Sequence, residues 1–166
     1  MLLAARIRVN SAWLGEKNSD GGGVRRFKKD GSGNLELNPD HVREQFRRAA
    51  LNCGLPGKLA ATLMIQPIFP PTIRLYDRRV TAVRQEQFES LRKGTQFGFE
   101  IFVDESRPAH PTEEQVDVLL RMIGQHFGLS PFGSKFGFGR FELLSLQCLP
   151  KPTAQSSTGE TPLSTS

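Results

Sequence analysis

Apolar and polar side chains alternate in several short stretches of the chain. In residues 2–14 an apolar residue stands at nearly every second position, with two arginines between them. The same period of two recurs in residues 95–103 and 138–146. Because successive side chains of a strand point to opposite faces, this period predicts three half-buried strands. Residues 61–69 and 72–77 are apolar and extended in character, with prolines typical of an edge strand or a bulge.

Two segments instead carry the period of a helix. Residues 38–53 begin with Asn38, a favourable N-cap, and present one apolar stripe before a glycine. Residues 112–127 begin with Thr112 and Gln115, the spacing of a capping box, and also end at a glycine. The pattern predicts two amphipathic helices, and a third, short helix over residues 84–93.

The order of these elements predicts the fold class. Strand, helix, two strands, helix and strand follow one another along residues 1–149. This order favours a single α+β domain of the ferredoxin-like βαββαβ type. Its antiparallel sheet would carry both long helices on one face, leaving the other face open for binding.

Two segments lack a regular period. Residues 15–37 hold two glycine clusters, which indicate turns, around a basic stretch centred on Phe27. We interpret this segment as a flexible basic arm or a short β-ribbon that contacts phosphates or is simply solvated. The cations of the arm are Arg25, Arg26, Lys28 and Lys29. Residues 150–166 are rich in Ser, Thr and Pro and predict a disordered tail.

A glycine-rich stretch between the second helix and the last strand carries the remaining functional signal. Its candidate contact residues are Gly133, Ser134, Lys135, Phe136, Gly137, Phe138, Gly139 and Arg140. If the strand begins near Phe136, Phe136, Phe138 and Arg140 share one face and the two glycines leave the other face bare. Two interpretations stay open: a loop that holds a phosphate with backbone N–H groups and Lys135, or a glycine-kinked strand with its aromatics in the core.

The net charge of the chain is compatible with an anionic partner but does not require one. The 166 residues carry a net charge of +5 and a pI near 9.6, which permits an anionic partner such as nucleic acid. Cys53 and Cys148 fit no metal or redox spacing and are expected to be buried thiols in a reducing compartment. No apolar run reaches the length of a membrane span, and the N-terminal apolar run is too short for a signal peptide, so we expect a cytoplasmic protein without membrane contacts.

The element order and the segment ending Phe136-Gly-Phe-Gly-Arg-Phe141 resemble the RAMP superfamily of CRISPR-associated RNA-binding proteins. That resemblance implies single-stranded nucleic acid as partner, RNA before DNA, together with other subunits of a nucleoprotein assembly. The segment also resembles the C-terminal part of small phage and prophage proteins, which implies a structural or assembly role as the rival.

A third hypothesis is a metal-independent ribonuclease. Some RAMP nucleases use a histidine near the first helix, and His41 lies there, with Tyr76 or Lys135 as assisting groups. The alternative for His41 is an ordinary surface histidine. No pattern for a cofactor, a metal site or a nucleotide-binding loop occurs, so none is expected.

Overall fold

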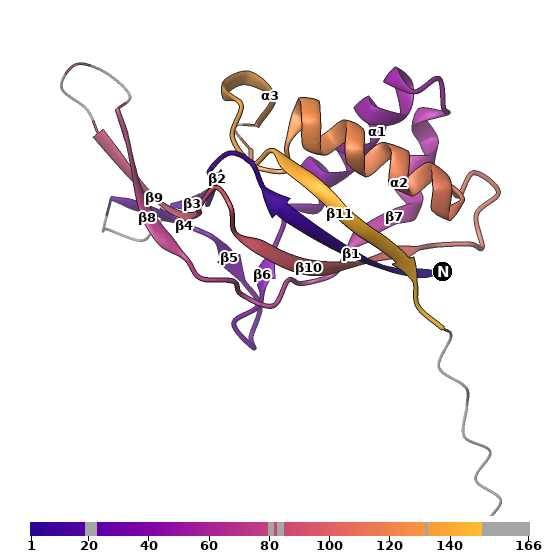
Figure 1. The fold of residues 1–166 in the computed structure, drawn as a ribbon, viewed down its shortest axis with the longest axis horizontal. Coiled ribbons are helices and arrows are strands. Elements are labelled where there is room, and N and C mark those ends of the chain that lie inside the picture. Colours follow the sequence, from indigo (N-terminus) through magenta and orange to yellow (C-terminus); the bar gives the residue numbers. More distant parts are fainter. Residues whose placement is uncertain (19–22, 80–81, 83–84, 132, 151–166) are drawn as a thin grey trace, which may run out of the picture.

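The computed structural model describes residues 1–150, apart from 19–22, 80–81, 83–84 and 132. Its centre is a four-stranded antiparallel sheet (Figure 1). The strand order across this sheet is β11 (Phe141–Cys148), β1 (Leu2–Val9), β10 (Gln96–Val103) and β7 (Leu63–Ile65). The predicted strands over 95–103 and 138–146 are thus confirmed, although the last begins at Phe141. The strand predicted over 2–14 is confirmed only to Val9, since Trp13–Leu14 form a separate strand of another sheet.

Two helices, α1 (Pro39–Asn52) and α2 (Glu113–Met122), lie together over one face of this sheet (Figure 1). Both begin where their caps predict. Asn38 accepts hydrogen bonds from the backbone N–H groups of the first turn of α1, and Thr112 forms the complete capping box of α2. A π-helical turn, η2 (Ile123–Phe127), extends α2 to Gly128, the predicted end.

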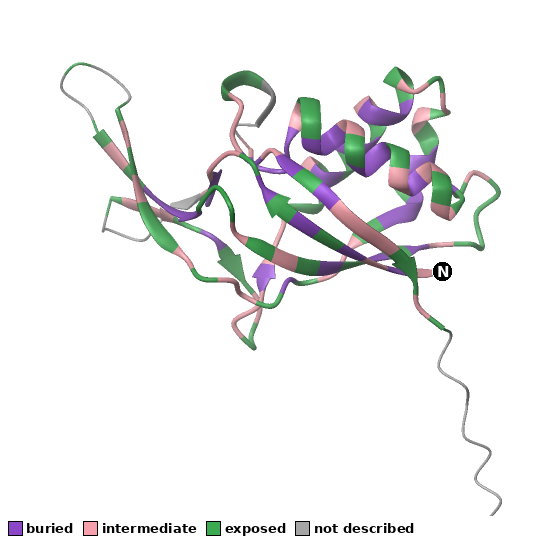
Figure 2. Cartoon of the chain, viewed as in Figure 1, coloured by how far each residue is buried: buried purple, intermediate pink, exposed green. Residues whose placement is uncertain are grey.

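Between the helices and the sheet lies the hydrophobic core (Figure 2). The alternation of buried and more exposed residues is clearest in β1, where every second residue is buried. The residues fully withdrawn from solvent include Leu3, Ile7, Phe46, Ile101, Leu119 and Phe141. The apolar faces read from the sequence therefore meet as predicted. Cys53 is half-buried, but Cys148 is exposed, because β11 is an edge strand and Cys148 is its last residue.

A second, five-stranded sheet adjoins the first. Its central strand β9 (Gln85–Leu91) pairs with β8 (Arg74–Arg79) on one edge. On its other edge β9 pairs with β2 (Trp13–Leu14) and with β4 (Val24–Arg26), the latter in parallel. The fifth strand, β3 (Lys17–Asn18), follows β4.

The helix predicted over residues 84–93 was therefore wrong, because the described part of this segment is strand β9. Its Gln, Glu and Leu residues favour a helix locally. Pairing with three other strands fixes the segment as extended, and the hydrogen bonds of those ladders outweigh a propensity of a few tenths of a kcal/mol per residue.

The described part of the 15–37 segment is also paired rather than a free arm. It contains β3, β4 and the two-stranded ribbon of β5 (Lys28–Lys29) and β6 (Leu35–Glu36). Phe27, expected to be a stacking ring, is only 7% exposed and belongs to the core. The ribbon interpretation therefore describes these residues better than the flexible arm. The predicted tail lies outside the described residues except for Pro150.

The segment after α1 differs from the predicted long strand. Residues 57–62 form the 3₁₀-helix η1 (Gly57–Thr62), and β7 extends only to Ile65. Pro67 prevents further pairing of β7, because proline has no N–H to donate. The chain as described is a mixed α+β protein, whose central layer follows the order β1, α1, β7, β10, α2, β11.

Candidate nucleic-acid interface

The glycine-rich stretch is bent rather than extended. Residues Gly133–Phe136 form one helical turn, α3, and Gly137 and Gly139 both have positive φ, at 76° and 69°. A strand cannot contain such residues at alternate positions, because extended backbone requires negative φ. The predicted shared face of Phe136, Phe138 and Arg140 was therefore wrong.

Gly128 and Gly139 allow two parts of the bend to touch. A Cβ atom on Gly139 would collide with the backbone of Ser130, and one on Gly128 would lie 2.5 Å from the carbonyl oxygen of Phe138. The Leu129 N–H donates to the Gly139 carbonyl over 3.1 Å across the same contact. These two glycines hold the bend closed. Their role is therefore structural, as in the second of the two interpretations of the glycine-rich stretch.

The bend places aromatic and cationic side chains against strand β8. The guanidinium carbon of Arg78 lies 4.4 Å from the ring centre of Phe136 and 5.8 Å from that of Phe138. The Phe138 ring packs edge-on against Tyr76, with centres 5.7 Å apart, and Lys135 Nζ lies 5.4 Å from the Phe136 ring centre. Phe136 is still 50% exposed. These residues, which we call the β8 cluster, combine an accessible ring with two cations.

Strand β8 supplies the part of the cluster that sequence reasoning missed. Arg74, Tyr76 and Arg78 stand at every second position and therefore on one face of β8. Tyr76 is the register partner of Phe88, and Arg25 of strand β4 pairs with Phe88 from the other side. Arg25 thus shares the face of the cluster. The sequence of β8 does show cations and a tyrosine at alternate positions. Their role in a binding site depends on the glycine-rich bend, which packs against this face of β8.

All four cations of the basic segment are paired with carboxylates, including Arg25, whose Nε lies 3.6 Å from the Glu86 carboxylate. The Lys28 ammonium lies 2.8 Å from Glu36, and Arg26 and Lys29 lie 3.3 and 3.4 Å from the same carboxylate oxygen of Glu89. The Glu89 carboxylate is only 8% exposed and also accepts from the Phe27 N–H. Since desolvated carboxylates require partners, we assign Arg26 and Lys29 mainly to anchoring this strand.

Arg140 also has a structural task. Its Nη1 donates to the Gln125 carbonyl at the end of the π-helical turn, and its backbone N–H donates to the Ser11 hydroxyl. The side chain is half-buried and its Nη1 is bound by the π-helical turn, so it serves the bend. For Gly133 and Ser134 the structure gives the backbone turn alone.

The three residues of the ribonuclease hypothesis do not form a catalytic group in the described structure. His41 lines a small cavity with Trp13 and Leu129, whereas Tyr76 and Lys135 contact the rings of the β8 cluster. Among the described residues, no hydrogen bond joins any two of the three. His41 is half-buried rather than a surface histidine, and its Nε2 makes no hydrogen bond within the described part of the chain.

His41 predicts a measurable pH effect on stability. Burial lowers the pKa of His41, and the nearby backbone of Ser130 and Leu129 offsets part of that. In the unfolded chain a histidine has a pKa near 6.5. If its pKa is lower in the folded protein, its contribution to stability is fully present at pH values above about 6.5 and is lost as the pH falls through the folded pKa. We therefore expect the wild type to lose more stability than His41→Gln between pH 7.5 and 5.5.

This difference is measured by urea unfolding at the two pH values. It stays below the limit of about 1.4 kcal/mol per pH unit for one proton, since the ring is partly solvated. His126→Gln is the matched control, because His126 is exposed. Equal pH dependence of the wild type and His41→Gln would contradict the assignment.

Two further observations concern metal ligands and membrane-spanning helices. In the described residues, no three His, Cys, Asp or Glu side chains are grouped as metal ligands. None of the helices formed by those residues has the length and apolar character needed to cross a bilayer.

Comparison with known proteins gives a likeness of fold. No protein-family model matches the chain, and no curated protein matches it in sequence. Among solved structures, a chain from the cryo-EM structure of the Type III-B Cmr-beta bound to cognate target RNA superposes with a TM-score of 0.55 at 14% identity. The match covers 88% of this chain but 59% of that one, so this chain spans little more than half of its neighbour. The likeness is one of fold alone.

Proposed function

We propose that residues 1–149 form a ferredoxin-like, RAMP-like domain that binds single-stranded nucleic acid, RNA in preference to DNA, over the β8 cluster. The observation that carries this proposal is the half-exposed ring of Phe136 beside the Arg78 guanidinium and the Lys135 ammonium. Proteins that bind single strands combine rings for base stacking with cations along the phosphate backbone.

The roles within the site follow from the contacts. Phe136 stacks on a base, while Arg78 lies over both Phe136 and Phe138, and Phe138 packs edge-on against Tyr76. Arg74, Arg78 and Lys135 face phosphates, and the glycines keep the bend closed. The preference for RNA, and a place beside other subunits of an assembly, are proposed from the RNA-bound complex that supplies the structural neighbour.

A salt titration tests this proposal directly. Binding of a mixed-sequence single-stranded RNA is measured by fluorescence anisotropy at several salt concentrations, with the DNA of the same sequence in parallel. Each phosphate contact contributes a slope of about −0.7 in log K against log salt. We expect Arg78→Ala and Lys135→Ala each to reduce the slope by about 0.7.

Lys28→Ala with Lys29→Ala is the matched comparison, because both ammonium groups are already paired with Glu36 and Glu89. We expect this double variant to change the slope less than Lys135→Ala does alone. No binding of either nucleic acid up to about 10⁻⁴ M at low salt would reject the proposal.

A further inference from the structure

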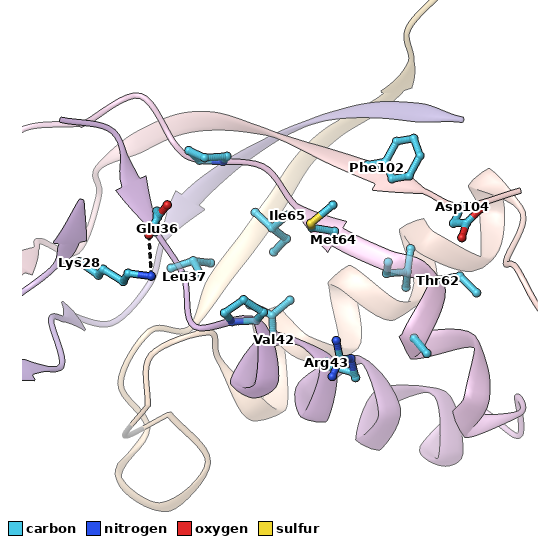
Figure 3. A pocket seen from close by; sticks show the side chains of 14 residues that line it. Lys28, Glu36, Leu37, Val42, Arg43, Thr62, Met64, Ile65, Phe102 and Asp104 are labelled. Atoms are coloured by element: carbon cyan, nitrogen blue, oxygen red, sulfur yellow. Dashed lines mark ion pairs between the residues drawn. The ribbon is translucent and has the colours of Figure 1, made fainter. Parts of the chain in front are cut away.

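A cavity of about 370 Å³ lies away from the β8 cluster, between α1 and the edge strand β7 (Figure 3). Apolar residues make up much of its lining, among them Leu37, Val42, Ile65 and the register partners Met64 and Phe102. Met64 and Phe102 are 52% and 41% exposed. The volume falls within the range of sites that hold a ligand or a partner side chain.

Beside this cavity the chain presents an exposed aromatic ring on a stiff segment. Phe69 is 81% exposed, whereas its neighbour Ile68 is buried. Two backbone hydrogen bonds of 2.7 and 2.8 Å join Ile68 to Leu35, and Pro70 and Pro71 restrict the residues that follow. Because the segment is already ordered, Phe69 would lose little conformational entropy on binding.

Phe69 lies on the cavity side of its segment but does not fill the cavity. Pro67 is part of the cavity lining, and residues two apart in an extended chain share a face, so Phe69 stands on the same side as Pro67. Phe69 is absent from the lining, and its exposure shows that it inserts nowhere in its own chain. An apolar ring and an apolar cavity are thus adjacent on one surface.

We propose that the occupant of this cavity is Phe69 of a second copy of this chain, in a symmetric dimer where each copy inserts its ring into the other. Adjacency of ring and cavity favours this closed arrangement, because a two-fold contact uses the same patch on both partners. A head-to-tail chain would instead need ring and cavity on different surfaces.

The charges around the cavity permit the contact. The charged residues of the lining are Lys28, Glu36, Arg43 and Asp104, two cations and two anions. The patch is therefore neutral although the whole chain carries +5, so two copies meet there with the least repulsion. A patch of this kind is small beside a standard interface, and we expect a dissociation constant in the micromolar range, about 1–100 μM.

Sedimentation equilibrium of nuclease-treated protein tests the dimer without bridging nucleic acid. The wild type is expected to pass from monomer to dimer with rising concentration and to stop there. Phe69→Ser removes the ring and Met64→Glu places a charge at the cavity, and each should weaken the dimer about 30-fold. Leu75→Ser is the control, since Leu75 is 59% exposed on β8 and outside the cavity lining.

Mixing the two variants separates a reciprocal contact from a merely sticky surface. A Phe69→Ser copy keeps its cavity and a Met64→Glu copy keeps its ring, so the mixed dimer retains one of the two insertions. We expect it to form more readily than either variant alone. A wild type that stays monomeric to about 200 μM, a dimer that survives Phe69→Ser, growth beyond the dimer, or no recovery on mixing would each overturn the proposal. Thermal unfolding confirms that every variant is folded.

Discussion

Replacing Phe136 by Ala is expected to weaken binding of single-stranded RNA by about 10-fold or more. Base stacking on an aromatic ring contributes about 1–3 kcal/mol per base, which corresponds to roughly 5- to 150-fold in affinity. The ring is half exposed and its partners in the protein are the side chains of Arg78 and Lys135, so folding depends on it little. The measurement is a fluorescence titration with mixed-sequence RNA at fixed salt.

The salt slope identifies the cause of that loss. Phe136→Ala removes no charge, so the slope of log K against log salt should stay within about 0.3 of the wild type, unlike that of Arg78→Ala. Phe136→Trp should retain most of the affinity, because the larger ring also stacks. Val118→Ala is the control, since Val118 is exposed on α2, outside both the β8 cluster and the cavity lining. Unchanged affinity in Phe136→Ala would remove this ring from the proposed site.

Replacing Gly139 by Ala is expected to destabilise the protein by about 2–5 kcal/mol. Positive φ costs a residue with a Cβ about 1–2 kcal/mol. The added atom also meets the backbone of Ser130, which cannot move without opening the bend, and overpacking of this kind costs a further 1–3 kcal/mol. Urea unfolding followed by circular dichroism measures the change. A loss of this size is a large share of the stability of a domain.

Gly137→Ala separates the two causes. Gly137 has almost the same φ, 76° against 69°, but its added Cβ would meet only the end of the Arg140 side chain, 3.9 Å away. We expect Gly137→Ala to lose about 1–2 kcal/mol, the backbone part alone. Equal losses of unfolding free energy in both variants would show that the contact of Gly139 with Ser130 contributes nothing to the effect.

Local chemistry explains what could be predicted of the fold. The caps at Asn38 and Thr112 act within one turn, and each was found as predicted. The alternation in β1 and β10 shows which face of each strand is buried, whatever the strand pairs with. For β9 the local preference was helical, and the neighbours on both edges decided otherwise.

The candidate site was predicted in part. Lys135, Phe136 and Phe138 come from the glycine-rich stretch that the sequence singled out, but their arrangement depends on a bend and not on a strand. Arg74 and Arg78 were missed, because nothing in β8 itself shows that the bend packs on its face. The sequence did not show that the cations of the basic segment are paired, since their carboxylate partners Glu36, Glu86 and Glu89 lie on other strands.

The sequence alone determined where the two long helices begin, the buried faces of the central strands and the presence of an aromatic, basic, glycine-rich stretch. These features arise from interactions between residues a few positions apart, or from a period that a single segment carries. Only the tertiary structure decided which cations are paired, which rings are exposed and that Phe69 stands beside a cavity. Those properties depend on residues distant in the chain, and burial and ion pairing exist only after the segments have packed together.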